Sequence, residues 1–203
     1  MCKKIMLTIL GIILIYGSVA FAIKAGLGVL PVDASITAIA QTIGMKVGTF
    51  SMIFHGCFFL GQIVMEKKEF QKTQLLQILY ITLGGSVLNF ILYVILKNIT
   101  FELYLVKLIV MIVAFIVSAF GCTLVLETRL MRTPMEGCIE ILAERRGTTM
   151  GKLRQKIDMG LLIVSVLLMF LFHTEWVVRE GTVIAAIIFG PAMDFWKRKV
   201  FSR

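Results

Sequence analysis

The chain has 203 residues, of which 59% are hydrophobic and 16% are charged, and its formal net charge is +9. Soluble proteins contain about 45–50% apolar and about 25% charged residues, and the apolar excess here lies in long runs, so an integral membrane protein is expected. Lys and Arg in cytoplasmic loops account for the positive charge, and no basic stretch alternates with exposed aromatic residues, so nucleic acid is excluded as a partner.

Six apolar segments follow one another along the chain, and each is predicted to be a transmembrane helix. The segments are residues 5–23, 49–65, 75–96, 105–126, 159–174 and 181–196. A spanning helix needs about 20 mainly apolar residues, so the first four segments are long enough and the last two are short.

The distribution of basic residues predicts the orientation of these helices. With the N-terminus inside, the segments predicted to be cytoplasmic contain 16 of the Lys and Arg residues and the outer segments contain 5. Basic residues accumulate on the cytoplasmic side of membrane proteins, so both termini are expected there.

An internal repeat relates the two halves of the chain. After a shift of 103 residues, six positions of the segment after the first span match six positions after the fourth span. The matched residues are Leu27, Pro31, Ile36, Ala40, Gly44 and Gly48 with Leu130, Pro134, Ile139, Ala143, Gly147 and Gly151. With a two-residue adjustment, Gly85 and Asn89 also match Gly190 and Asp194. We therefore predict one membrane domain over 1–203, with halves 1–100 and 101–203. Since each half has three spans, the second half should have the opposite orientation.

Each repeated segment is predicted to form a short helix, over 31–43 and 134–146. Proline favours the first turn of a helix and glycine favours the position after its end, as Gly44 and Gly147 do here. A helix of about 13 residues is about 20 Å long, which is too short for a hydrocarbon core of about 30 Å. These helices should therefore be re-entrant or interfacial. Gly48 and Gly151 should allow close packing where the next span begins.

Two acidic residues, Asp33 and Glu136, occupy equivalent positions in these short helices. A structural interpretation is a capping box in which Thr133 is the N-cap and Glu136 the N3 residue, with both acids favourable to the helix dipole. A functional interpretation is that carboxylates at half-helix ends bind ions or polar solute at the repeat interface. Asp33 is the better functional candidate, because Leu30 has no side chain that could cap the helix.

Three further polar residues lie in apolar surroundings. His55 is in the middle of the second span, Asp158 is its repeat equivalent, and Asn89 is in the third span. Ionisable groups within a membrane are costly and are functional candidates by default. The alternatives are a hydrogen bond from His55 to a neighbouring helix, a headgroup-level position for Asp158, and interhelical bonding by Asn89.

The sequence contains no pattern typical of a cofactor, a metal site or an enzyme. Its four cysteines have no paired spacing, and there is no nucleophile elbow, metal-binding helix pair or phosphate-binding glycine loop. We therefore expect no cofactor, no metal and no enzymatic activity.

The segments "LGVLPVDASITAIAQTIGMKVGTF" (27–50) and "IIFGPAMDFW" (187–196) resemble the YczE/YitT-type family of bacterial multipass membrane proteins. The resemblance extends over nearly the whole chain. It implies a protein of the bacterial cytoplasmic (inner) membrane and supports the predicted architecture, but it implies no particular activity.

Two functions are compatible with these features. The first is a small-molecule or ion permease that works by alternating access between inverted halves. Its expected pathway residues are Asp33, His55, Asn89, Glu136 and Asp158. Its expected hinges or half-helix ends are Pro31, Gly44, Gly48, Pro134, Gly147 and Gly151. The alternative is a non-transporting partner or regulator that acts through the cytoplasmic segment 127–158. The expected partners are the lipid bilayer, a small solute or ion, and a second copy of the chain or another membrane protein.

Overall fold

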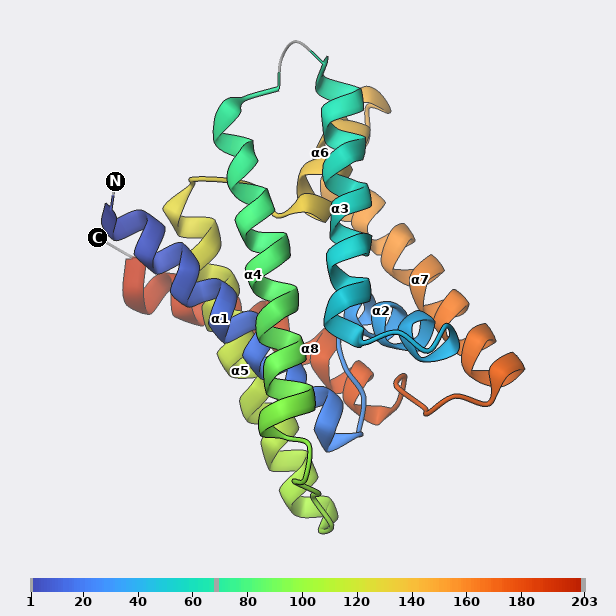
Figure 1. The fold of residues 1–203 in the computed structure, drawn as a ribbon. Helices are drawn as coiled ribbons and strands as arrows, with labels where there is room; N and C mark the ends of the chain where they lie inside the picture. Colours follow the sequence, from blue (N-terminus) through green and yellow to red (C-terminus); the bar gives the residue numbers. More distant parts are fainter. Residues whose placement is uncertain (1, 68–69, 202–203) are drawn as a thin grey trace.

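The computed structural model describes residues 2–67 and 70–201, and within these residues the fold is entirely helical (Figure 1). The α-helices are α1 (Cys2–Ala25), α2 (Pro31–Thr42), α3 (Val47–Glu66), α4 (Gln77–Phe90), α5 (Tyr104–Thr128), α6 (Pro134–Arg145), α7 (Met150–Phe172) and α8 (Glu180–Trp196). A 3₁₀ turn, η2 (Lys72–Leu76), leads into α4, and π-helical turns extend α4 and α8 as η3 (Ile91–Ile95) and η4 (Lys197–Phe201). The all-α prediction is confirmed for these residues. Lys68 and Arg203 are two of the 16 basic residues assigned to the cytoplasmic side, and both lie outside the described residues.

Five helical segments are long and apolar enough to cross a membrane. They are Lys3–Ala25, Val47–Glu66, Lys72–Ile95, Tyr104–Thr128 and Met150–Phe172. They coincide with the first five predicted spans, so the chain is a multipass membrane protein. The sixth predicted span corresponds to α8, which has 17 residues and is not among the five. A helix of that length is about 26 Å long, so a sixth crossing stays a prediction.

The helix that contains the fifth predicted span begins before the apolar segment does. Helix α7 begins at Met150 rather than at residue 159, and the Thr149 side chain accepts a hydrogen bond of 3.4 Å from the backbone N–H of Lys152. Hydropathy missed these turns because they carry charged residues, which a helix tolerates where it leaves the apolar layer.

The two short helices agree closely with the prediction. Each has 12 residues and begins with proline. Gly44 and Gly147 follow with φ of +67° and +58°, a conformation that glycine adopts without strain. In both cases the residue after the glycine donates a backbone hydrogen bond back across the last turn, from Met45 to Ala40 and from Thr148 to Ala143. Both helices therefore end in the same Schellman motif.

The second glycine of each repeat behaves differently in the two halves. A Cβ atom at Gly48 would overlap the carbonyl oxygen of Gly85 and the side chain of Asn89, so α3 and α4 pack closely there. At Gly151 no atom lies within 4 Å of the same position. The predicted close packing is thus confirmed at Gly48 and wrong at Gly151, because no helix covers the start of α7 in the way that α4 covers the start of α3.

Helices from the two halves are interleaved. Helix α1 packs against α5, and Gly11 and Gly121 lie at the point of closest approach. A Cβ atom added to either glycine would lie only 2.7–2.8 Å from the carbonyl oxygen of the other, so only glycine fits at these positions. The short helix α2 packs on α7, and the short helix α6 packs on α3. Helix α4 packs on α1, and α8 packs on α5. Helices α3 and α4 also pack together, but α7 and α8 have no comparable contact among the described residues, and α7 is the least buried of the five long helices.

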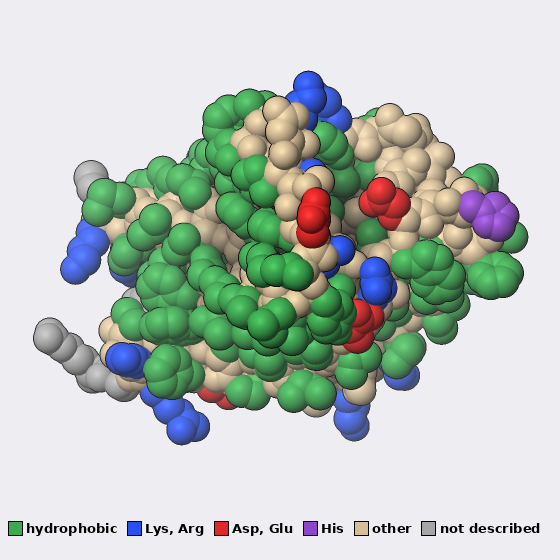
Figure 2. Space-filling view, turned by 90° about the horizontal axis from the view of Figure 1, so that it is seen from below, with side chains coloured by type: hydrophobic (Ala, Val, Ile, Leu, Met, Phe, Trp, Pro, Cys, Tyr) green, Lys and Arg blue, Asp and Glu red, His purple; other side chains and the backbone are tan. Residues whose placement is uncertain are grey.

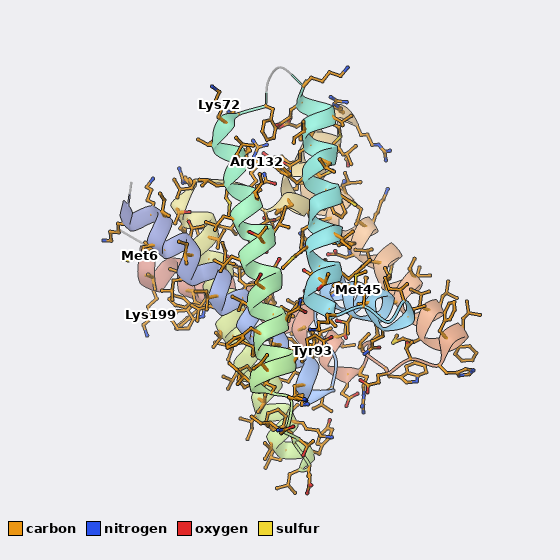
Figure 3. The ribbon with its side chains drawn as sticks, in the orientation of Figure 1. Met6, Met45, Lys72, Tyr93, Arg132 and Lys199 are labelled. Carbon is orange, nitrogen blue, oxygen red and sulfur yellow. The ribbon has the colours of Figure 1, made fainter. Side chains whose placement is uncertain are left out.

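The outer surface is apolar, as expected of helices that face lipid. Figure 2 shows hydrophobic side chains over much of the face seen from below, with a group of acidic and basic side chains near its middle and further basic side chains at its edges. Exposed apolar residues on α7 include Ile163, Phe170 and Leu171. In Figure 3, Met6 of α1 and Lys199 of η4 lie on the same side of the molecule, whereas Met45 and Tyr93 lie away from them.

Candidate functional site

The N-terminal ends of α2 and α6 reach a common central cavity of about 470 Å³. All eight α-helices contribute to its lining, and both short helices do so through their first turns. Small-molecule sites have volumes of about 300–1,000 Å³, so the space is suited to a small solute. The cavity lies where the two halves of the chain meet.

Three carboxylates and one guanidinium group line this cavity: Asp33, Glu136, Asp158 and Arg154. Arg154 Nε donates to both carboxylate oxygens of Asp158, at 3.1 and 3.0 Å. Its second nitrogen, Nη1, lies 3.6 Å from Oε1 of Glu136. Arg154 is thereby paired with two of the three acids, and it neutralises at most one of their charges.

Asp33 is the acid without a direct partner. Within the described residues its carboxylate forms no hydrogen bond or ion pair, although the charge of Arg154 acts on it from a longer distance. Burial raises the pKa of Asp33 to about 7, and the charge of Arg154 opposes this change. The carboxyl group can therefore exchange a proton near neutral pH.

Aromatic and hydroxyl groups form another part of the lining. The ring centroids of Tyr16 and Tyr80 are 5.4 Å apart, and the His55 ring is 5.8 Å from Tyr80 and 6.4 Å from Tyr16. His55 is 8% exposed and its Nδ1 has no hydrogen-bond partner within the described residues. The same holds for Oγ of Ser118, which is 2% exposed. Unpaired buried polar atoms are uncommon and indicate a missing partner.

The structure brings four of the five predicted pathway residues together. Asp33, His55, Glu136 and Asp158 all line the cavity, but Asn89 does not. Asn89 Oδ1 accepts a 2.9 Å hydrogen bond from the backbone N–H of Gly48, and its Nδ2 donates to Thr49 Oγ1 at 2.9 Å. Asn89 therefore satisfies the start of α3 and matches the interhelical bonding interpretation.

The predicted capping box is wrong. Thr133 is the N-cap of α6, but its side chain makes no capping hydrogen bond. Glu136 turns to Arg154 instead, because an ion pair with a guanidinium group is stronger than a hydrogen bond to a neutral backbone N–H. Helix α2 likewise has no side-chain cap at Leu30.

The predicted half-helix residues divide between the cavity and the helix ends. Pro31 lines the cavity, and Pro134 is buried beside it as the first residue of α6. Gly44 and Gly147 lie at the far ends of the short helices, and Gly48 and Gly151 lie at or near the starts of α3 and α7.

Two anchors that hold the short helices were not predicted. Gln62 Nε2 donates to the Pro134 carbonyl at 2.6 Å, and Gln62 and Gln77 exchange two amide hydrogen bonds of 3.0 Å. On the other side, Ser165 Oγ donates to Ser35 Oγ at 3.0 Å and so joins α7 to α2. The sequence could have indicated the first anchor, because Gln62 and Gln77 are polar residues within apolar segments.

Arg154 was also missed as a site residue, since the sequence placed it only among the cytoplasmic basic residues. Its spacing from Asp158 was the available signal, because residues four apart on a helix share one face. The cavity and the apolar exterior together define a multipass membrane protein with a central cavity that contains charged side chains.

Comparison with known proteins assigns the chain to a family. Residues 2–198 match a family of unknown function (DUF6198), and the chain belongs to it. It is 24% identical over 127 residues to the "Uncharacterized protein YyaS" of Bacillus subtilis (strain 168), which covers 63% of this chain. The match includes 62% of that relative, so it spans less than two thirds of the relative's length. No solved structure matches the chain.

Proposed function

We propose that this protein is a permease for a small solute and works by alternating access between two inverted halves in a bacterial cytoplasmic membrane. The observation that carries this proposal is the meeting of two half-helix N-termini, one from each half, at a cavity that is lined by all eight helices and contains four charged side chains. Discontinuous helices that end at a central site between repeats are typical of secondary transporters. The likeness to the YczE/YitT-type family stays a prediction alongside this proposal.

Helix packing supports the inverted repeat. The repeat makes α2 equivalent to α6 and α3 equivalent to α7. The counterpart of the packed pair α2–α7 is therefore the pair α6–α3, and both pairs are in contact. The repeat also relates α1–α4 to α5–α8, which are both present. Reciprocal exchange of this kind is expected of two halves related by a twofold axis in the membrane plane.

The exception to this symmetry supports alternating access. Helices α3 and α4 are closed on each other at Gly48, whereas the equivalent helices α7 and α8 are apart. In a transporter with inverted repeats, the two halves adopt different conformations, and exchanging them produces the other access state. Arg154 and Asp158 line the cavity near the start of α7, on the predicted cytoplasmic side. We therefore assign this conformation to an inward-open state.

Labelling of Cys122 tests alternating access without knowledge of the solute, because this native cysteine lines the cavity. The variant has Cys2, Cys57 and Cys138 replaced by serine and is treated with a membrane-impermeant thiol reagent in oriented vesicles. A permease exposes Cys122 to reagent from either side of the membrane. Labelling from one side alone contradicts the proposal. The matched control retains only Cys57, which lies on the outer surface.

A non-transporting regulator that acts through residues 127–158 is the second candidate. Its support is the exposed C-terminal end of α6, where Glu144 and Arg146 face outward. Arg132 pairs with Glu140 at 3.1 Å and Arg145 donates to the Met65 carbonyl, so these groups also stabilise the fold. Co-purification of a membrane-protein partner with the wild type, lost in Glu144→Gln/Arg146→Gln, is the result that favours regulation.

A further inference from the structure

We propose that the central cavity binds a small organic monocation, with Asp33 as its counter-ion and the rings of Tyr16 and Tyr80 as its aromatic wall. This inference deepens the proposed permease by naming its solute class, and it rests on that proposal only for movement across the membrane. Binding itself depends on the cavity alone.

The charge of the cavity favours a cation. Glu136 and Asp158 already share Arg154, whereas Asp33 has no direct partner within the described residues. Helix N-termini attract anions, but here Asp33 and Glu136 occupy the first turns of the two short helices and already supply negative charge. An anionic solute would meet these carboxylates in a confined space, whereas a cation would complete the pairing of Asp33.

The aromatic lining favours an ammonium ion over a hard metal ion. Cations bind to tyrosine rings when they lie within about 6 Å of the centroid, and aromatic cages recognise quaternary ammonium groups in this way. The centroids of Tyr16, Tyr80 and His55 lie within 6.4 Å of one another, so one solute can contact several rings.

Two unpaired polar atoms add directional partners. His55 and Ser118 line the cavity, both side chains are more than nine-tenths buried, and their Nδ1 and Oγ atoms have no hydrogen-bond partner within the described residues. An N–H or O–H group on the solute could donate to either atom once that side chain turns its polar atom toward the cavity. Such a bond removes the cost of leaving these atoms unpaired.

The size and ligand set of the cavity exclude a bare metal ion as the favoured occupant. No cluster of three or more His, Cys, Asp or Glu residues within the described part of the chain is placed to hold a metal. The volume of about 470 Å³ also greatly exceeds that of one ion. The remaining class is an organic cation.

Equilibrium binding to purified protein in lipid nanodiscs tests this inference. The probes are tetramethylammonium, choline and tetraethylammonium, and 3,3-dimethyl-1-butanol serves as the neutral isostere of choline. We expect saturable binding of at least one cation at pH 8 and at least tenfold weaker binding of the neutral isostere. Asp33→Asn should weaken cation binding at least tenfold and Tyr80→Leu at least threefold. The matched control Glu144→Gln removes an exposed acid and should change nothing.

Several results would overturn the inference. They are the absence of saturable binding for all three cations, equal binding of choline and its neutral isostere, and unchanged binding in Asp33→Asn when that variant shows the thermal stability of the wild type. If Asp33→Asn is unstable, Asp33→Glu, which keeps the charge, must retain binding within tenfold. Two-sided labelling of Cys122 without cation binding overturns this inference alone, and cation binding with one-sided labelling overturns only the permease.

Discussion

Substitution of Gly48 by alanine tests the asymmetry between the two halves, because its repeat equivalent Gly151 is a matched control. A methyl group at Gly48 would overlap the backbone of Gly85 and displace the Asn89 side chain from the start of α3. At Gly151 the same group meets no atom within 4 Å. The same change of residue, in the same repeat position, should therefore have opposite consequences.

The expected loss of stability can be estimated from these contacts. Overpacking of a closely packed position costs about 1–3 kcal/mol. Loss of the two hydrogen bonds of Asn89 adds about 0.5–1.5 kcal/mol each, so Gly48→Ala should destabilise the protein by about 2–6 kcal/mol. Gly151→Ala should be neutral or stabilising by up to about 1 kcal/mol, because alanine is the better helix former.

Thermal unfolding of the detergent-solubilised protein, followed by loss of the monodisperse peak, measures both variants. We expect Gly48→Ala to unfold at least about 4 °C below the wild type, by an estimate of roughly 2–4 °C per kcal/mol. Gly151→Ala should unfold at the wild-type temperature or above it. Equal losses in the two variants would refute the asymmetry, since they would mean that a helix covers both positions alike.

Three further predictions concern access, pH and the helix anchors. Gly151→Leu should leave stability near that of the wild type but abolish labelling of Cys122 from the outside. The reason is that closure of α7 on α8 would bring residue 151 against the neighbouring helix. Two-sided labelling in this variant contradicts the exchange of conformations between the two halves. Cation binding should be about tenfold weaker at pH 6 than at pH 8, because protonation of Asp33 below its pKa of about 7 removes the counter-charge. Asp33→Asn should bind cations equally at both pH values, and a flat wild-type profile from pH 6 to 8 contradicts this role. Gln62→Leu should cost about 2–4 kcal/mol in thermal unfolding, since it removes the hydrogen bond to the Pro134 carbonyl and leaves Oε1 of Gln77 unpaired in the interior. An unchanged unfolding temperature would show that the anchor contributes nothing.

The pH prediction involves every charged or titratable group that lines the cavity with Asp33. These groups are Arg154 and Asp158 on α7, Glu136 on α6, His55 on α3, Tyr16 on α1, Tyr80 on α4 and Cys122 on α5. Loss of the pH effect in Asp33→Asn distinguishes protonation of Asp33 from protonation of the other groups.

The sequence predicted the parts of this structure that depend on local signals. Proline at the start and glycine at the end bound the two short helices to within a residue, because these residues act through their own backbone conformation. The repeat then indicated that Asp33 and Glu136 are equivalent, and the structure brings both to one cavity.

The parts that depend on tertiary contacts were not predicted. Thr133 and Glu136 have the spacing of a capping box, but Arg154 from the next helix competes for the carboxylate. Asn89 and Asp158 were both candidate pathway residues in the sequence, and only the packing of α4 on α3 directs Asn89 away from the cavity. Likewise, nothing local distinguishes Gly48 from Gly151, since the difference arises from the position of α8.

The central claim is that the two halves exchange conformations around one cavity, and spin-label distances measure this directly. Labels at Lys152 and Phe195 report the separation of α7 from α8, and labels at Lys46 and Lys97 report the equivalent separation of α3 from α4. In lipid nanodiscs, the account predicts two populations for each pair, with the short distance of one pair accompanying the long distance of the other. Tetramethylammonium should change the ratio of the two populations. A single population for both pairs, unchanged by the cation, would contradict the account.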